Sequence, residues 1–428
     1  MSLSKLSLFL LFSLGASQAS AAGYALIEQS VTGLGRAFSG SAAVADDAST
    51  IFFNPAGMAA LEQREMALGL NYIAPTVDFD NADSSLPDGS ALTGADGGDP
   101  GENAILPNLY YVHPLGNGWT AGIGITSPFG LVTDYHDNWI GRYHARKSDL
   151  KTVNINPSIA FQATEKLALG AGISLQYADI ELSQAVDFGA AIGQSQMLDG
   201  QAKVLGDDWA WGFNLGLTYQ FTPKTRLGLS YRSKIKHDLE GDGKFRIPSG
   251  AEPIAAAGGA ENGKISGSVT LPEIVSLALH HQFNSNWAIM ADATWTRWSR
   301  FDALIIDSPV VALNSEKTQD WDDTMRYGIG IEYTPGNQWQ WRAGIAYDET
   351  PVPDSTLRTP RIPDQNRKWL AFGATYSYNE NIKIDAAYAH LFVSDSHIDD
   401  VNDNGYRLNG TYQTHIDLFA VQMRWILN

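Results

Sequence analysis

The chain has 428 residues, a formal net charge of -18 and no cysteine, and only 18% of its residues are charged. A soluble domain usually carries about a quarter charged residues, and an excess of acid argues against nucleic acid as a partner. The low charge is accompanied by 12 Trp, 17 Tyr, 17 Phe and 41 Gly, a profile typical of an outer-membrane β-barrel.

Residues 1–21 are predicted to be a secretory signal peptide. Lys5 supplies the positive start, residues 6–14 form an apolar run, and Ala19-Ser20-Ala21 offers a cleavage site. The apolar run is too short to span a bilayer as a helix. We therefore expect an exported chain whose mature part begins at Ala22.

Residues 22–63 form the next unit, rich in Gly, Ala and Ser and without strand alternation. Within it, Asn54-Pro55-Ala56-Gly57 consists of residues that favour a turn. This composition predicts a compact segment rather than a strand.

From residue 65 onward, apolar and polar or small residues alternate. In residues 211–221 every odd position is large and apolar, and the even positions are Gly, Asn, Thr or Gln. Successive strand side chains point to opposite faces, so one face of each such segment is apolar. About fourteen segments show this pattern: 65–74, 105–113, 119–127, 149–162, 167–182, 209–221, 226–240, 263–282, 287–300, 324–334, 339–349, 368–378, 382–392 and 414–427.

The connections between these segments alternate between two classes. Short turns such as 115–118, 222–225 and 284–286 alternate with long loops rich in Gly, Asp and Pro, such as 75–104 and 183–208. Short turns on one side, long loops on the other and an even strand count predict an all-β transmembrane barrel in the outer membrane, with both termini in the periplasm. A lumen of this size must be filled or else forms a pore, so residues 22–63 are predicted to be a luminal plug, or hatch, and residues 64–428 the barrel.

Several stretches in chain order resemble the FadL/TodX family, outer-membrane transporters of long-chain fatty acids and aromatic hydrocarbons. They are SVTGLGRAFSGSAAVADDASTIFFNPAGMAAL (30–61), SPFGLVTDY (127–135), YRSKIKHDLEG (231–241), LPEIVSLAL (271–279), WAIMADATWTRWSRF (287–301) and DETPVPDSTLRTPRIPDQNRKWLAFG (348–373). The resemblance implies a 14-stranded barrel with an N-terminal hatch. It also implies a luminal pocket and a sideways exit at a kink in the third strand, next to the Asn-Pro-Ala turn.

The resemblance assigns two sets of gating residues. Asn54, Pro55 and Ala56 would hold the hatch against the kinked strand; the alternative is a plain tight turn. On our count the third strand ends at Pro128-Phe129-Gly130, and Pro, which lacks an N–H, belongs at a strand end, bulge or gap.

Three cations are candidate contacts for a ligand carboxylate, which needs a cationic or hydrogen-bonding partner in an apolar lumen. Lys317 precedes Trp321 and Arg326 at a spacing like that of a ligand-contacting lysine in fatty-acid members, although it could be a solvated loop lysine. Arg342 and Arg232 fall on the polar faces of their strands, where arginines often pair with acids. Residues 177–184 lack the basic residues of fatty-acid members, which leaves uncharged ligands open.

We find no sequence sign of catalysis, a metal site or a cofactor. The segment 400–405 matches the start of a calcium loop, but its twelfth position is Thr411 instead of Glu. No G-x-S-x-G or H-E-x-x-H motif is present.

The sequence thus predicts passive uptake of long-chain fatty acids or similar hydrophobic compounds, by a monomer surrounded by outer-membrane lipid and lipopolysaccharide. A transporter of aromatic or alkane hydrocarbons is the first alternative, and a general porin is the alternative of another class.

Overall fold

The computed structural model describes residues 23–427; the predicted signal peptide, residues 1–21, lies outside them. The segments in which apolar and polar residues alternate form one sheet of twenty strands. They are β1 (Arg64–Asn81), β2 (Ala104–Gly116), β3 (Trp119–Thr126), β4 (Gly130–Asp134), β5 (Lys147–Gln162), β6 (Leu167–Asp187), β7 (Asp199–Thr222), β8 (Thr225–Arg232), β9 (Ile235–Arg246), β10 (Gly263–Leu271), β11 (Ile274–Gln282), β12 (Trp287–Thr296), β13 (Ala303–Asp307), β14 (Ser315–Thr318), β15 (Thr324–Tyr333), β16 (Trp339–Asp348), β17 (Arg367–Ser377), β18 (Ile382–Val393), β19 (Ser396–Val401) and β20 (Arg407–Leu427).

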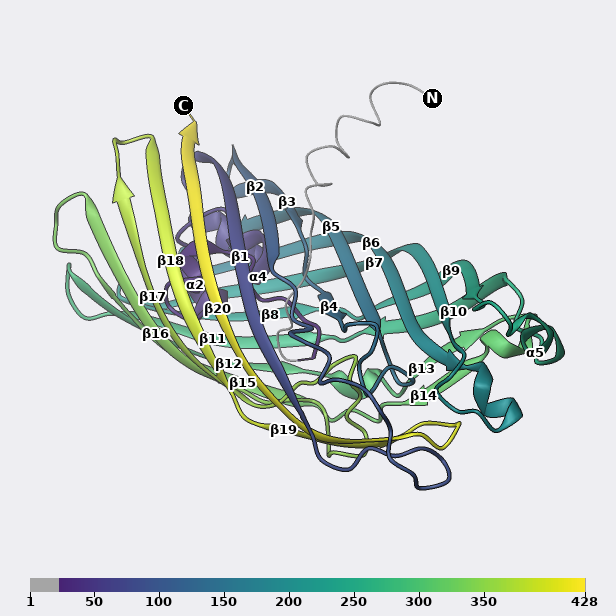
Figure 1. Cartoon of the computed structure of the whole chain (residues 1–428). Coiled ribbons are helices and arrows are strands. Elements are labelled where there is room, and N and C mark those ends of the chain that lie inside the picture. The colour runs from purple at the N-terminus through teal and green to yellow at the C-terminus, as the bar shows by residue number, and fades with distance from the viewer. Residues whose placement is uncertain (1–22, 428) are drawn as a thin grey trace.

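These strands form a closed antiparallel barrel with fourteen positions in its wall (Figure 1). Six positions are divided into two consecutive strands each: β3 with β4, β8 with β9, β10 with β11, β12 with β13, β14 with β15, and β18 with β19. The ring closes where β1 pairs with β20 in one uninterrupted register, from Arg64 opposite Leu427 to Asn81 opposite Gly410. The predicted fold class is therefore confirmed.

The two faces of the wall differ as the alternation predicts. On β7, Trp211 is 70% exposed and Phe213 39% exposed, whereas Asn214 between Phe213 and Leu215 is buried. Apolar side chains on the outer face avoid the cost of placing polar groups in hydrocarbon. The buried positions of this stretch of β7 are small or polar: Gly212, Asn214 and Thr218.

Two predicted strands that we expected to be continuous are interrupted, and these two predictions were wrong. Segment 226–240 is divided at Ser233-Lys234, where the Ser233 hydroxyl oxygen accepts from Phe213 N at 2.8 Å in place of a ladder bond. Segment 263–282 is divided at Pro272-Glu273, because Pro cannot donate to the ladder. The predicted strand 287–300 ends earlier, at Thr296.

Four strands lie wholly in segments that we had expected to be long loops: β4, β13, β14 and β19. Strands β6, β7 and β20 also run beyond the predicted segments, to Asp187, from Asp199 and from Arg407. This part of the sheet carries the short helices η2 (Phe188–Ile192), α5 (Glu252–Ala257), η3 (Trp298–Arg300) and η4 (Val311–Leu313). It projects from one end of the barrel, with α5 near its tip (Figure 1).

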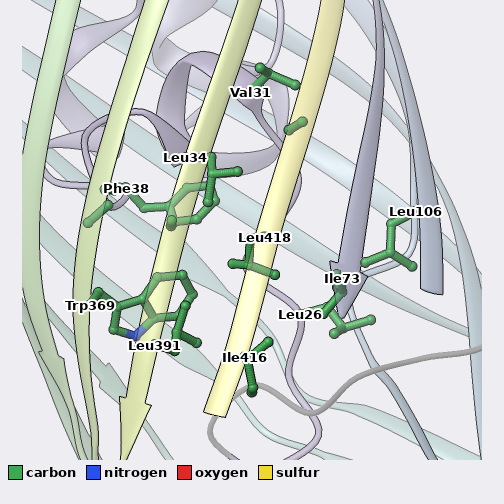
Figure 2. Close-up of a cluster of buried hydrophobic side chains, with 14 of the residues drawn as sticks. Leu26, Val31, Leu34, Phe38, Ile73, Leu106, Trp369, Leu391, Ile416 and Leu418 are labelled. Carbon is green, nitrogen blue, oxygen red and sulfur yellow. The ribbon is translucent and has the colours of Figure 1, made fainter. Parts of the chain in front are cut away.

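The segment 23–61, which we call the N-terminal segment, folds into short helices that lie within the ring of strands (Figure 1). They are α2 (Val31–Leu34), α3 (Ser41–Val44), α4 (Thr50–Phe53) and the 3-10 helix η1 (Pro55–Ala60). Helix α2 packs against β17, β18 and β20, and α3 against β8, β11 and β12. Figure 2 shows Leu26 beside Ile73 and Leu106 in the largest apolar cluster, which joins the N-terminal segment to the wall. None of the helices among residues 23–427 is long and apolar enough to cross a membrane.

Candidate functional site

The wall is interrupted between β2 and β4. The ladder of β2 with β3 stops at Leu109 opposite Ile125, and a single bridge, Gly101 opposite Thr133, rejoins the two sides. Residues 102–108 and 126–132 therefore face each other without a ladder, and we call this interruption the wall break. It spans roughly 25 Å along the strand.

A one-residue bulge at Ser127-Pro128-Phe129 produces the wall break. Thr126 lies opposite Asn154 of β5 and Gly130 opposite Lys151, so three residues face two. Such a bulge bends the strand, and Pro128 has no N–H to donate. The predicted residues Pro128, Phe129 and Gly130 lie here, but the strand resumes at Gly130 as β4 instead of ending.

The start of the N-terminal segment is bonded to the wall break. Leu26 N donates to Pro128 O at 2.8 Å, and Gly130 N donates to Tyr24 O at 2.9 Å. The Gln29 side chain donates to Ser127 O at 2.7 Å. Backbone groups that the missing ladder leaves free are thus satisfied from inside the barrel, as buried polar groups must be.

The Asn54–Ala56 turn lies against a different part of the wall. The Asn54 amide donates to Ala42 O at 2.6 Å and to Leu217 O of β7 at 3.0 Å, and its oxygen accepts from Ala56 N at 3.1 Å. A Cβ on Gly216 would overlap Asn54 Oδ1, and a Cβ on Gly170 of β6 would overlap the turn's backbone. The residues bonded to the wall break are therefore Tyr24, Leu26 and Gln29, whereas the turn is fixed to β6 and β7.

Four aromatic side chains surround Tyr24, and only one of them, Phe129, has a role that was proposed from the sequence. Its ring centroid lies 4.7 Å from that of Trp298, 5.5 Å from Phe301, 5.7 Å from Trp321 and 6.1 Å from Phe129. Trp298 was expected in the strand 287–300 but lies in η3, and Phe301 and Trp321 lie between strands, where alternation gives no signal. Their contact with the N-terminal segment is a product of the fold.

A cavity of about 120 Å³ lies between the N-terminal segment and the wall. Leu26, Phe52 and Phe53 line it from the segment, and Pro128 and Phe129 line it at the wall break. Small-molecule sites usually measure about 300–1,000 Å³. The cavity as it stands holds only part of a long hydrophobic chain.

The structure places the three candidate cations differently. Arg232, at the end of β8, lines the cavity and donates to Phe52 O at 2.7 Å. Lys317 on β14 lies outside the cavity lining and is bonded to Asp400, which also contacts His144 Nδ1 at 2.9 Å. Arg342 on β16 is also outside the lining and pairs with Glu332 at 3.2 Å. Arg326, which the sequence offered only as a spacing marker, lines the cavity and pairs with Asp292 at 3.4 Å.

A family model described as outer membrane protein transport protein (OMPP1/FadL/TodX) matches residues 12–426. The chain belongs to this family. Among its relatives, the long-chain fatty acid transport protein of Escherichia coli O6:H1 is 33% identical over 401 residues, covering 87% of this chain and 88% of that protein. Outer membrane protein P1 of Haemophilus influenzae is 30% identical over 458 residues, covering 96% of each.

Solved structures agree with the family assignment. A Pseudomonas aeruginosa FadL homologue matches with a TM-score of 0.89 at 28% identity, covering 95% of this chain and 100% of that chain. The toluene transporter TodX of P. putida matches with a TM-score of 0.68 at 20% identity, covering 89% of this chain and 94% of that chain, which shows the shared fold alone. As a member of the OMPP1/FadL/TodX family, the chain is an outer-membrane transport protein and not an enzyme, as the sequence predicted.

Proposed function

We propose that this protein takes up long-chain fatty acids or similar hydrophobic compounds, which bind in the lumen and leave sideways through the wall break. The observation that carries the proposal is the interrupted ladder between β2 and β4. Pro128 and Phe129, which lie at this interruption, also line the cavity. The relative from E. coli O6:H1, named as a long-chain fatty acid transport protein, supports the ligand class.

A sideways exit suits a hydrophobic ligand because it avoids water. Exposing each CH₂ group to water costs about 0.8 kcal/mol, so an acyl chain that crossed an aqueous pore would meet a large barrier. An opening toward the lipid lets the chain move between two apolar surroundings. In this proposal the wall break faces the bilayer.

In this proposal the N-terminal segment is a hatch. Tyr24, Leu26 and Gln29 occupy the inner side of the wall break and must withdraw for a ligand to pass. Asn54, Pro55 and Ala56 hold the rest of the hatch against β6 and β7. Lys317 and Arg342 stay predicted ligand contacts, since each would have to give up an acidic partner to bind a carboxylate.

A disulfide between the N-terminal segment and one edge of the wall break tests the proposal. Ala25 and Phe129 form an isolated antiparallel bridge, which brings their Cα atoms to a spacing compatible with a disulfide. The natural chain has no cysteine, so the two introduced cysteines have no competing partner. We expect oxidised Ala25→Cys/Phe129→Cys to lose oleate uptake and to regain it on reduction. The pair Ser85→Cys/Ala91→Cys, at an isolated bridge in the loop after β1, is the matched control.

Three outcomes separate the alternatives. Uptake of oleate that continues with the Ala25/Phe129 disulfide fully formed would contradict the exit. Uptake of toluene or an alkane without oleate would favour a hydrocarbon transporter. Free passage of small ions and sugars would favour a general porin.

We further propose that the protein is a monomer surrounded by outer-membrane lipid and lipopolysaccharide. Light scattering of the purified protein with its bound lipid can test this.

A further inference from the structure

Arg232 occupies an unusual electrostatic position. Its side chain is buried, with 9% exposure, at the point where β8 ends and the wall strand is interrupted before Ile235. One guanidinium nitrogen donates to Phe52 O at 2.7 Å, and the guanidinium lies 4.3 Å over the Phe52 ring. Within residues 23–427, no carboxylate lies within ion-pair distance of Arg232.

The other buried arginines of the wall strands all have an acidic partner. They are Arg326 with Asp292 at 3.4 Å, Arg342 with Glu332 at 3.2 Å, Arg424 with Asp385 at 2.7 Å, and Arg367 with Asp364. Burying a guanidinium without a counter-charge is costly, and a carbonyl oxygen and an aromatic face compensate only part of that cost. The missing negative charge therefore has to be explained.

The cavity gives Arg232 the surroundings that an amphipathic ligand needs. Leu26, Ile27 and Phe129 offer apolar surface for a hydrocarbon chain, while Ser230 and Ser276, beside Arg232 on the wall, offer hydroxyl groups. A guanidinium binds a carboxylate through two parallel N–H donors, which fixes its orientation as well as its charge.

We propose that Arg232 binds the anionic head group of the ligand, so that it selects carboxylates over uncharged compounds with the same chain. This inference rests on the proposed uptake of hydrophobic compounds and names the head group that the cavity selects. Phe52 lies in α4, two residues before Asn54, so the guanidinium that holds the head group is also bonded to the hatch. Head-group binding and the position of α4 are thereby linked.

Paired ligands test the selection. Binding of radiolabelled oleate and of oleyl alcohol to the purified full-length protein is measured at a pH at which oleate is ionised. Arg232→Gln should weaken oleate binding by roughly tenfold or more and leave oleyl alcohol binding within about twofold. Arg232→Lys should recover part of the loss, because the charge returns without the two parallel donors.

Arg226→Gln is the matched control. Arg226 lies on the same face of β8, is partly buried, and has no carboxylate within ion-pair distance among the described residues, but it does not line the cavity. The Arg226→Gln substitution should leave the binding of both ligands unchanged. Far-UV circular dichroism checks that each variant keeps its strands.

The remaining outcomes are decisive. An equal loss of oleate and oleyl alcohol in Arg232→Gln, or no loss, would overturn the head-group role while leaving the transport proposal intact. Wild-type binding of oleyl alcohol with no preference for oleate would also overturn it. Wild-type protein that binds neither ligand would contradict the proposed function itself, and with it this inference.

Discussion

At the scale of single residues, Glu28 is a carboxyl group of the N-terminal segment whose protonation the fold changes. It is buried, and its Oε2 has no hydrogen-bond partner. Burial raises the pKa of Glu28 from 4.5 to about 7. The charge of Asp348 raises this pKa further, whereas the charges of Arg367 and Arg326 lower it. The docked segment therefore prefers Glu28 in its neutral form.

The sign of the pH dependence follows. Because the pKa is raised in the docked state, the docked state binds the proton more tightly, and stability is lost as pH rises from 4.5 through about 7. Glu28→Gln, which resembles the neutral form, should keep residues 24–30 protected from hydrogen exchange at pH 8, whereas the wild type opens more readily at pH 8 than at pH 5. Rates are compared after correction for intrinsic exchange.

The control is Glu62→Gln, an exposed carboxyl just beyond the N-terminal segment, which should follow the wild type. If Glu28→Gln and the wild type showed the same pH profile, the neutral Glu28 would have no role in docking.

At the scale of elements, the fit between the N-terminal segment and the wall depends on inward-facing glycines. Gly216 and Gly170 leave room for the Asn54–Ala56 turn, and Gly228 leaves room for the backbone of Ala42. Alternation predicted that these positions lie on the inner face. It does not tell whether a glycine there faces water or a packed backbone, because the sequence pattern is the same in both cases. Only the folded chain brings residue 54 against residue 216.

Gly216→Ala should displace the turn, because its Cβ would overlap Asn54 Oδ1 and lie 3.0 Å from Ala56 N. Overpacking of this kind typically costs about 1–3 kcal/mol. We expect faster proteolysis of the N-terminal segment with the barrel strands intact. Gly206→Ala on the same strand is the control, since its Cβ would meet no atom closer than 3.5 Å. Equal protease resistance in the two variants would argue against a tight contact of the turn with β7.

At the scale of the whole molecule, the described N-terminal segment occupies the lumen. Nearly all of residues 23–58 are buried, and they contact strands around the ring. A barrel of fourteen strands without such a filling would enclose a water channel. The segment is the feature that separates the proposed hatch from an open porin.

Removing the segment should open that channel. We expect a variant that lacks residues 23–61 and retains the predicted signal peptide to give a higher single-channel conductance in planar bilayers than the full chain. Circular dichroism confirms that the strands are retained. A barrel with intact strands and unchanged conductance would contradict a luminal plug.

Alternation and turn chemistry predicted much of this architecture, but the site was harder to predict. Pro128 indicated the gap because it cannot donate to a ladder, and the structure places the bulge at that residue. From the sequence, Lys317 was a candidate by its spacing from Trp321 and Arg326, and Arg232 by its place on the polar face of a strand. In the structure, Asp400, far along the chain, pairs with Lys317, whereas no acid among residues 23–427 pairs with Arg232. Sequence spacing cannot reveal this difference.

The sequence by itself determined the closed barrel, its fourteen wall positions and its family, because side-chain alternation is a local property that the bilayer enforces strand by strand. The tertiary structure decided where the wall is interrupted, which backbone groups of the N-terminal segment are bonded there, and which of the candidate cations pair with an acid. These features depend on contacts between residues that are distant in the chain, where register and charge pairing are fixed only when the ring closes.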